Sequence, residues 1–192
     1  DTFGVTSALN LEFETHFHHF LMPSVRGGTY GSKKHYCGSI LENGEMKLVF
    51  KGMESVRSDW TDLAKDFQNE LIRRVFCGLP VHDYVNDTVN KVKKGIFDNQ
   101  LIYKKRLRKN LNDYTVNVPP HAQAARLLKT PAHIIRYYIT TSGPQPLENL
   151  SSPIDYDHYI DCQLKPVADS ILEFVGTSFD NIISGQQDLF GP

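Results

Sequence analysis

The residues WTDLAKDFQNELIRRVFCGLP (60–80) mark a change in the hydrophobic period of the chain, and this change indicates the class of fold. Before Trp60 apolar and polar residues alternate, as they do in strands. After it apolar side chains recur every four residues, at Leu63, Phe67, Leu71 and Val75. Asp59 or Thr61 can cap the resulting helix, and Gly78 can end it. The pattern predicts an α+β protein with a boundary near Trp60, antiparallel strands before it and a mainly helical subdomain after it.

The part of the chain before this boundary has the pattern of an antiparallel sheet. Hydrophobic and polar residues alternate over residues 9–17, which predicts a strand with one buried face. Two further β-rich runs, 34–41 and 46–50, flank Asn43-Gly44. Because Asn-Gly favours the positive φ angles of a tight turn, these two runs are expected to form a hairpin.

The part after residue 80 is predicted to be helical with two extended segments. In chain order we expect a helix that Pro80 opens, that runs through residues 84–92 and that ends at Gly95, and then an extended segment over 101–109. A short helix that begins at Pro119-Pro120, a strand over 134–141 and a helix over 155–174 that bends before Pro166 are expected to follow. Together with the helix after Trp60, these elements make residues 61–185 one mainly helical subdomain.

Basic residues are concentrated in one segment of the chain. Residues 91–109 contain eight Lys and Arg side chains and one acid, so their net charge is +7, whereas the whole chain has a net charge of −1. Such a distribution is typical of a face that binds a polyanion. The alternative is an ordinary solvated surface, which is the more frequent meaning of a basic run by itself.

Composition predicts a folded protein with a substantial core. The chain has 192 residues, of which 40% are hydrophobic. It has neither a long apolar run of the kind that spans a membrane nor the pattern of a signal peptide, so we expect a cytoplasmic protein without membrane contact. Its three cysteines, Cys37, Cys77 and Cys162, are scattered and are expected to be reduced, buried thiols.

Two acids and two histidines occupy every second position in and directly after the first expected strand, at Glu12, Glu14, His16 and His18. On one face of a strand they could share a divalent cation, which makes a small metal-dependent hydrolase one candidate function. Alternate side chains on a strand are about 7 Å apart, however, which is too far for several of them to ligate one ion unaided. A polar, solvated face is the alternative interpretation.

Two short motifs have a composition suited to binding. Lys33-Lys34-His35-Tyr36 combines two ammonium groups with a phenol, a set that can hold phosphates and pack against sugars. Near the C-terminal end, the motif 186–190 reads Gln-Gln-Asp-Leu-Phe. A Leu-Phe pair beyond the last helix either folds back or docks into an apolar pocket of a partner.

These features, in this order and spacing, resemble family B DNA polymerases. The resemblance extends over nearly the entire chain and is carried by residues 6–17, 33–38, 51–60, 101–108, 117–126, 152–159 and 186–190. It implies that residues 1–60 are the C-terminal part of the palm, 61–185 the thumb, and 186–192 a tail that binds the bacterial sliding clamp. The parent enzyme would be a DNA-directed DNA polymerase of replication or repair, which adds deoxynucleotides with Mg²⁺ by two-metal nucleotidyl transfer.

The resemblance also assigns roles to individual residues. Those implied to contact primer–template DNA are Lys33, Lys34, Tyr36, Lys104, Lys105, Arg106 and Arg108. Those implied to bind the clamp are Gln186, Leu189 and Phe190. Glu12 and Glu14 match an acidic pair beside the catalytic centre of the family, with Glu14 the better candidate for an auxiliary carboxylate. His35 stands where the family more often has arginine.

Other expectations follow from what the chain lacks. The Asp-Thr-Asp element of the family does not occur, since Asp1-Thr2-Phe3 only begins like it. We therefore expect a polymerase fragment that is inactive alone and holds no metal or other cofactor of its own. The connection between Leu128 and Ile134 is shorter than is usual in the family. The remaining alternative is a stand-alone, clamp-recruited duplex DNA-binding module without catalysis.

Overall fold

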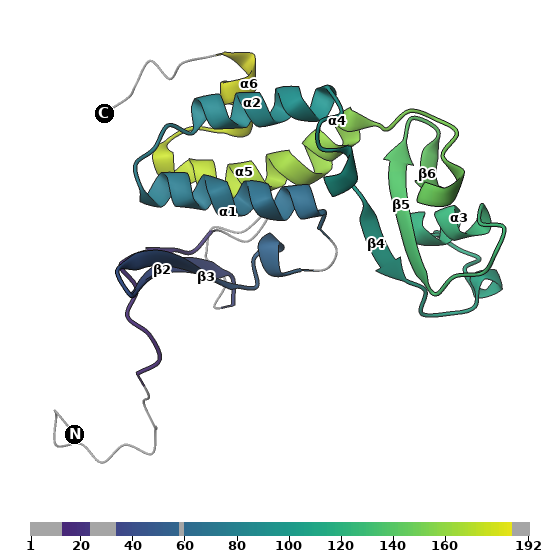
Figure 1. Cartoon of the computed structure of the whole chain (residues 1–192), viewed down its shortest axis with the longest axis horizontal. Helices are drawn as coiled ribbons and strands as arrows, with labels where there is room; N and C mark the ends of the chain where they lie inside the picture. The colour runs from purple at the N-terminus through teal and green to yellow at the C-terminus, as the bar shows by residue number, and fades with distance from the viewer. Residues whose placement is uncertain (1–12, 24–33, 58–59, 186–192) are drawn as a thin grey trace.

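The structure is a computed structural model, and it describes residues 13–23, 34–57 and 60–185. A layer of helices carries two small sheets, one beneath helix α1 and one beside the end of the helical layer (Figure 1). Both sheets are antiparallel, which confirms the predicted α+β class.

The first sheet is formed by strands β1 (His19–Leu21), β2 (Tyr36–Glu42) and β3 (Glu45–Lys51), in the order β1-β2-β3. Asn43 and Gly44 form the turn of the β2–β3 hairpin with φ angles of 55° and 83°. The prediction of this hairpin from Asn43-Gly44 is therefore confirmed.

The strand predicted over residues 9–17 is wrong for the part that the structure describes. Residues 13–17 are irregular, and Phe13 is 85% exposed. The chain leaves the sheet here because the ring of Phe17 lies over Gly38, where a Cβ atom would come within 2.3 Å of it. Phe17 also packs against the rings of Phe20 and Tyr36, and these contacts replace an extension of β1.

The helical layer contains α1 (Asp62–Phe76), α2 (His82–Lys93), α5 (Lys165–Leu172) and α6 (Phe179–Ser184). α1 packs against α5, and α2 against α6. As predicted, α1 begins just after Thr61, whose side chain accepts a hydrogen bond from the Ala64 N–H. One hydrophobic core joins this layer to the first sheet, because Cys37 and Met53 are buried in the same cluster as the helices.

The last long helical stretch begins with α4 (Tyr156–Tyr159), continues as a π-helix over Ile160–Leu164 and then becomes α5. Pro166 has no N–H to donate to the preceding turn, which accounts for the irregularity at the predicted place. The π-helix places the buried Gln163 so that its Oε1 accepts the Thr61 N–H at 3.0 Å.

The second sheet and a short helix form a separate lobe. Its strands are β4 (Tyr103–Arg106), β5 (Ile134–Thr140) and β6 (Gly143–Pro146), in the order β4-β5-β6. Helix α3 (Pro120–Arg126) packs against β5 and β6. A small core of Ala124, Ala125, Ile135 and Tyr137 lies between helix and sheet. Short 3-10 helices complete the fold at Glu54–Val56, Asp98–Gln100, Leu111–Asp113, Leu147–Asn149 and Glu173–Val175.

Two further expectations concern membranes and cysteines. Within the described ranges no helix combines the length and the hydropathy needed to cross a bilayer. Cys37 is a buried free thiol, and burial raises its pKa to about 12. Cys77 and Cys162 are exposed and form no disulfide, so the prediction of buried thiols is wrong for these two.

Candidate nucleic-acid interface

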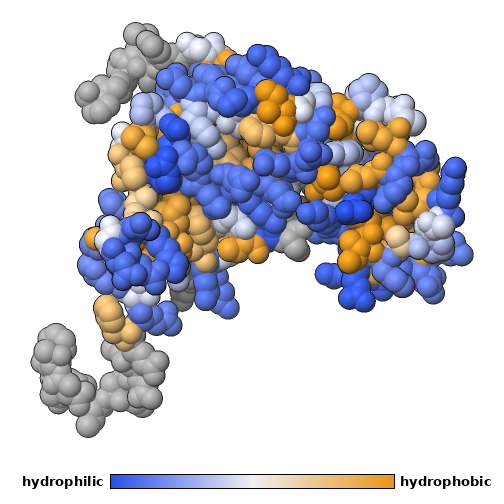
Figure 2. Space-filling model, viewed as in Figure 1, coloured by the Kyte–Doolittle hydropathy of each residue, from blue (hydrophilic) through white to orange (hydrophobic). Residues whose placement is uncertain are grey.

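The second sheet lies beside the end of the helical layer and extends past it on the side of the first sheet, and open space separates the two sheets (Figures 1 and 2). The first sheet and the 3-10 helix Glu54–Val56 that follows it lie on one side of this space, and β4 lies on the other. Of the predicted DNA-binding residues that the structure describes, Tyr36 begins β2, Lys34 lies in the turn just before it, and the others lie on β4 or in the loop after β4.

Strand β4 separates its basic side chains onto two faces. Lys104 and Arg106 are exposed on one face, while Tyr103 and Lys105 are partly buried on the other. Successive side chains of a strand point to opposite faces, so this pattern follows directly from the strand geometry. Tyr103 packs against the small core of the second lobe, which shows that its face is the one covered by α3.

The exposed face of β4 is turned towards the first turn of α1. Lys104 Nζ lies 3.1 Å from Asp62 Oδ2, in an ion pair whose side chains are 54% and 51% exposed. This contact joins the second lobe to the start of the helical layer. Lys104 and Arg106 therefore stand on the side of the lobe that borders the open space.

Lys105 and Arg108 form a different group, around His121 at the start of α3. The pKa of His121 is lowered, first by its burial and then by the positive charges of Lys105 and Arg108. A cation near an imidazole disfavours the protonated ring. The four basic residues predicted to bind DNA together are thus divided between two faces of the second lobe, with Lys104 and Arg106 on one face and Lys105 and Arg108 on the other.

Arg136 was not among the predicted site residues, although it lies directly opposite Lys104 in the register of β4 and β5. Its side chain is exposed, between the buried residues Ile135 and Tyr137. The β-rich composition of residues 134–141 predicted a strand here, but it did not indicate which of its side chains would be exposed. The sequence held no signal for the pairing of that strand with β4.

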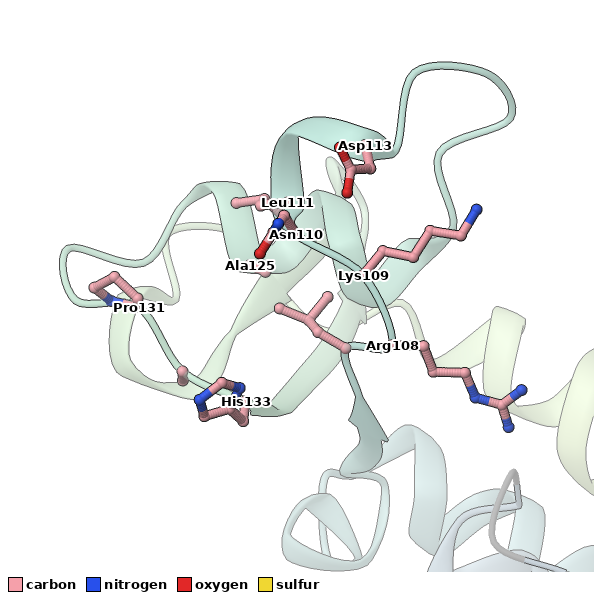
Figure 3. Close-up of a pocket in the computed structure, with 10 residues that line it drawn as sticks. Arg108, Lys109, Asn110, Leu111, Asp113, Ala125, Pro131 and His133 are labelled. Carbon is pink, nitrogen blue, oxygen red and sulfur yellow. The ribbon is translucent and has the colours of Figure 1, made fainter.

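A hollow of about 620 Å³ lies beside the loop after β4. Its lining includes Leu107, Leu111 and Ala125, together with residues 131–133 of the short connection between Leu128 and Ile134. The side chains of Arg108 and Lys109 point away from its interior (Figure 3). These two cations are therefore directed towards solvent rather than into the hollow.

The motif at the start of β2 is held in place by Gly52. Gly52 has a φ of +67°, and a Cβ atom there would lie 2.0 Å from the Lys34 carbonyl oxygen. The His35 Nδ1–H donates to the Gly52 carbonyl oxygen at 3.1 Å. Lys34 is exposed, and the ring of Tyr36 packs against Phe20 at 5.2 Å between centroids. Lys33, the first residue of the motif, lies outside the described residues.

The acidic candidates do not form a metal site in the part of the chain that the structure describes. Glu14 is exposed on an irregular segment, and Glu12 lies outside the described residues. Over the described ranges no three His, Cys, Asp or Glu side chains are grouped so that they could hold a metal ion. The predicted clamp-binding residues Gln186, Leu189 and Phe190 also lie outside the described ranges.

Known proteins match this chain over most of its length. DNA polymerase family B matches residues 4–175. DNA polymerase II of Escherichia coli K12 is 47% identical over 97% of this chain, which corresponds to 25% of that protein. DNA polymerase 2 of Aeropyrum pernix is 28% identical over 80% of this chain and 21% of that protein. The solved structure of the family B DNA polymerase from Pyrobaculum calidifontis has a TM-score of 0.59 and 27% identity, and covers 78% of this chain and 21% of that one. The chain spans about a quarter or less of the length of these relatives.

Proposed function

The chain belongs to DNA polymerase family B, and we propose that it holds primer–template duplex DNA as part of a DNA-directed DNA polymerase that acts in replication or repair. The observation that carries the proposal is the exposed face of β4, on which Lys104 and Arg106 border the open space between the two sheets. In this proposal the polyanion that this face binds is the phosphate backbone of duplex DNA.

Phosphate contacts suit the task of a polymerase. An enzyme that copies any sequence must hold every duplex about equally well, and phosphates carry no direct sequence information. Lys104, Lys105, Arg106 and Arg108 would position the duplex through such contacts. Binding should then weaken steeply as the salt concentration rises, because each phosphate contact releases condensed counterions.

The motif at the start of β2 would contact the duplex near the primer terminus, through Lys33, Lys34 and Tyr36. Support comes from the way in which Gly52 and His35 fix the beginning of this strand, while Phe20 supports the ring of Tyr36. Tyr36 is the first residue of β2, and a regular strand with packed neighbours holds such a contact more precisely than a loop does. In this proposal residues 1–60 belong to the palm and residues 61–185 to the thumb.

The tail, residues 186–192, would bind the bacterial sliding clamp through Gln186, Leu189 and Phe190. Its motif has the two adjacent apolar side chains that dock into a pocket of a partner. A tether to the clamp raises the effective concentration of the polymerase on DNA without any new DNA contact. Since the clamp and the DNA of a bacterium lie in the cytoplasm, we place the activity there.

The described residues contain no group of side chains that could bind two Mg²⁺ ions. Two-metal nucleotidyl transfer needs several carboxylates around both cations, and no such group of side chains occurs in residues 13–23, 34–57 and 60–185. In this proposal the catalytic step and the Mg²⁺ belong to the parts of a family B polymerase that this chain, which covers 25% of Escherichia coli DNA polymerase II, does not span. A primer-extension assay should find no extension by the 192 residues alone, with Escherichia coli DNA polymerase II as the positive control.

The proposed DNA contact is tested by fluorescence anisotropy with labelled primer–template duplexes of unrelated sequence. We expect similar affinities for all of them. In the double charge reversal Lys104→Glu with Arg106→Glu, which changes the two exposed cations of β4, the slope of log affinity against log salt concentration should become shallower by about two. Affinities and slopes equal to those of the unchanged chain would overturn the proposal.

A further inference from the structure

We propose that Arg136 binds a DNA phosphate and that, with Lys104 and Arg106, it completes a basic face made from two strands, a role that rests on the function proposed above. This basic face consists of Lys104 and Arg106 from β4 and Arg136 from β5. The residues are far apart in the sequence, and the sheet brings them together.

The register of the sheet defines the geometry of the basic face. Lys104 pairs with Arg136, and Arg106 pairs with Ile134. Directly opposed residues of an antiparallel pair have Cβ atoms about 5 Å apart, and diagonal neighbours such as Arg106 and Arg136 are about 7–8 Å apart. Three cationic side chains therefore project from one small, exposed part of the sheet.

Lys104 and Arg136 differ in whether a carboxylate already neutralises their charge. Lys104 is already paired with Asp62. Within the described residues no carboxylate forms an ion pair with Arg136, although Glu148 and Arg136 line one small hollow together. Arg136 is therefore the member of the opposed pair whose charge is free to bind an anion.

The direct opposition of the cations Lys104 and Arg136 affects the stability of the sheet. Like charges directly opposite each other on a sheet are unfavourable, so this arrangement does not serve the stability of the fold. A phosphate between the two side chains would convert the repulsion into two attractive contacts. Arginine suits this role because its planar guanidinium group can donate two hydrogen bonds to one phosphate.

Neighbouring residues limit how far Arg136 can move from this position. Ile135 and Tyr137, on either side of it, are buried in the core of the second lobe. Tyr138 is buried as well and packs in the larger core. The backbone of Arg136 is thus fixed on both sides, while its side chain is exposed.

The test compares Arg136→Gln with Arg126→Gln, each in the 192-residue chain, by anisotropy titration of a labelled primer–template duplex at several salt concentrations. Arg126 is an exposed arginine of α3, the helix on the opposite face of the same sheet, so this control removes the same charge from the same lobe. We expect Arg136→Gln to weaken binding about three- to ten-fold and to reduce the salt slope by about one, whereas Arg126→Gln changes neither appreciably. Arg136→Lys should restore most of the salt slope because it keeps the charge.

Each outcome has a defined meaning. If the unchanged chain does not bind duplex DNA, the function proposed above fails. If the unchanged chain binds but Arg136→Gln and Arg126→Gln behave alike, the role of Arg136 is overturned and the function remains. The free energy of unfolding in urea separates binding from folding, because the loss of an unfavourable charge pair should leave Arg136→Gln at least as stable as the unchanged chain.

Discussion

The hydroxyl oxygen of Tyr159 accepts a hydrogen bond from the Ile139 N–H at 2.9 Å, and this bond joins the helical layer to the second sheet. Tyr159 is completely buried. Its ring stacks on that of Tyr103 with centroids 5.5 Å apart, and Tyr103 stacks in turn on Tyr137. The orientation of β4, and of the basic face on it, therefore depends on a set of tyrosines at the junction of the two lobes.

Tyr159→Phe should destabilise the protein. The change leaves the ring in place but deprives the Ile139 N–H of its acceptor, and an unsatisfied donor of this kind costs about 1–3 kcal/mol. Urea unfolding followed by circular dichroism measures the loss. Tyr137→Phe is the matched control, because Tyr137 is also buried and stacked but no hydrogen bond involves its hydroxyl group within the described residues. Equal losses in the two variants would contradict the role given to the Tyr159 hydroxyl.

Gly52→Ala should perturb the start of β2 more than an ordinary glycine substitution does. The new Cβ would lie 2.0 Å from the Lys34 carbonyl oxygen, at a φ of +67°. Gly44→Ala is the control, since Gly44 also has a positive φ but a Cβ atom there would have no neighbour within 4 Å. We expect a loss of about 1 kcal/mol for Gly44→Ala from the backbone alone and at least about 2 kcal/mol for Gly52→Ala, where a steric clash is added.

A DNA-binding titration extends this comparison. If Lys34 and Tyr36 contact the duplex, Gly52→Ala weakens binding under conditions in which both variants remain folded, and Gly44→Ala does not. Unchanged DNA affinity in a folded Gly52→Ala variant would argue against the role of this motif.

Several elements were predictable because their signals are local. Asn43-Gly44 specified a hairpin through the φ angles that the turn requires, and the spacing of apolar residues after Trp60 specified α1. Pro166 marked the irregular turn in the last helix. In each case neighbouring residues in the sequence determine the conformation.

The rest could not be predicted because it depends on contacts between distant residues. The first strand begins only at His19, after Phe17 has packed on Gly38, and alternation along one strand does not reveal such a contact. Strand β6, with the sequence Gly-Pro-Gln-Pro, has little β-propensity and exists because β5 pairs with it. For the same reason Arg136 was missed, since its position opposite Lys104 depends on the register of β4 and β5.

The stability of the protein should fall in alkaline solution. Burial raises the pKa of Cys37 from 9.0 to about 12 and the pKa of Tyr137 from 10.0 to about 12. Because the unfolded chain loses these protons at lower pH than the folded chain, their contribution to stability is present below pH 9.0 and is lost progressively as the pH rises to about 12. Urea unfolding in the presence of a reductant, at a series of pH values, measures this loss. In Cys37→Ala the decline should begin closer to pH 10.0, where the tyrosines start to ionise; a decline that still begins near pH 9.0 would exclude Cys37 as its cause.

Asp62→Asn should tighten DNA binding while slightly lowering stability. Asp62 holds Lys104 at 3.1 Å and competes with a phosphate for it. An exposed ion pair is worth up to about 1 kcal/mol, so release of Lys104 should improve the affinity for duplex DNA by about two- to five-fold. The free energy of unfolding should fall by about 0.3–1 kcal/mol, because Asp62 also stabilises the first turn of α1.

Asp66→Asn is the control that separates this specific effect from a general loss of negative charge. Asp66 is exposed on the same helix. The pKa of Tyr84 is raised first by burial and to a smaller extent by nearby acids that include Asp66, which places Asp66 near α2 rather than near β4. Both variants change the net charge by one, but only Asp62→Asn frees Lys104. In anisotropy titrations at low salt concentration, Asp62→Asn should therefore bind duplex DNA more tightly than Asp66→Asn. The difference should disappear when Lys104→Gln is added to both variants, and a difference that persists would show that Asp62 acts on DNA binding by another route.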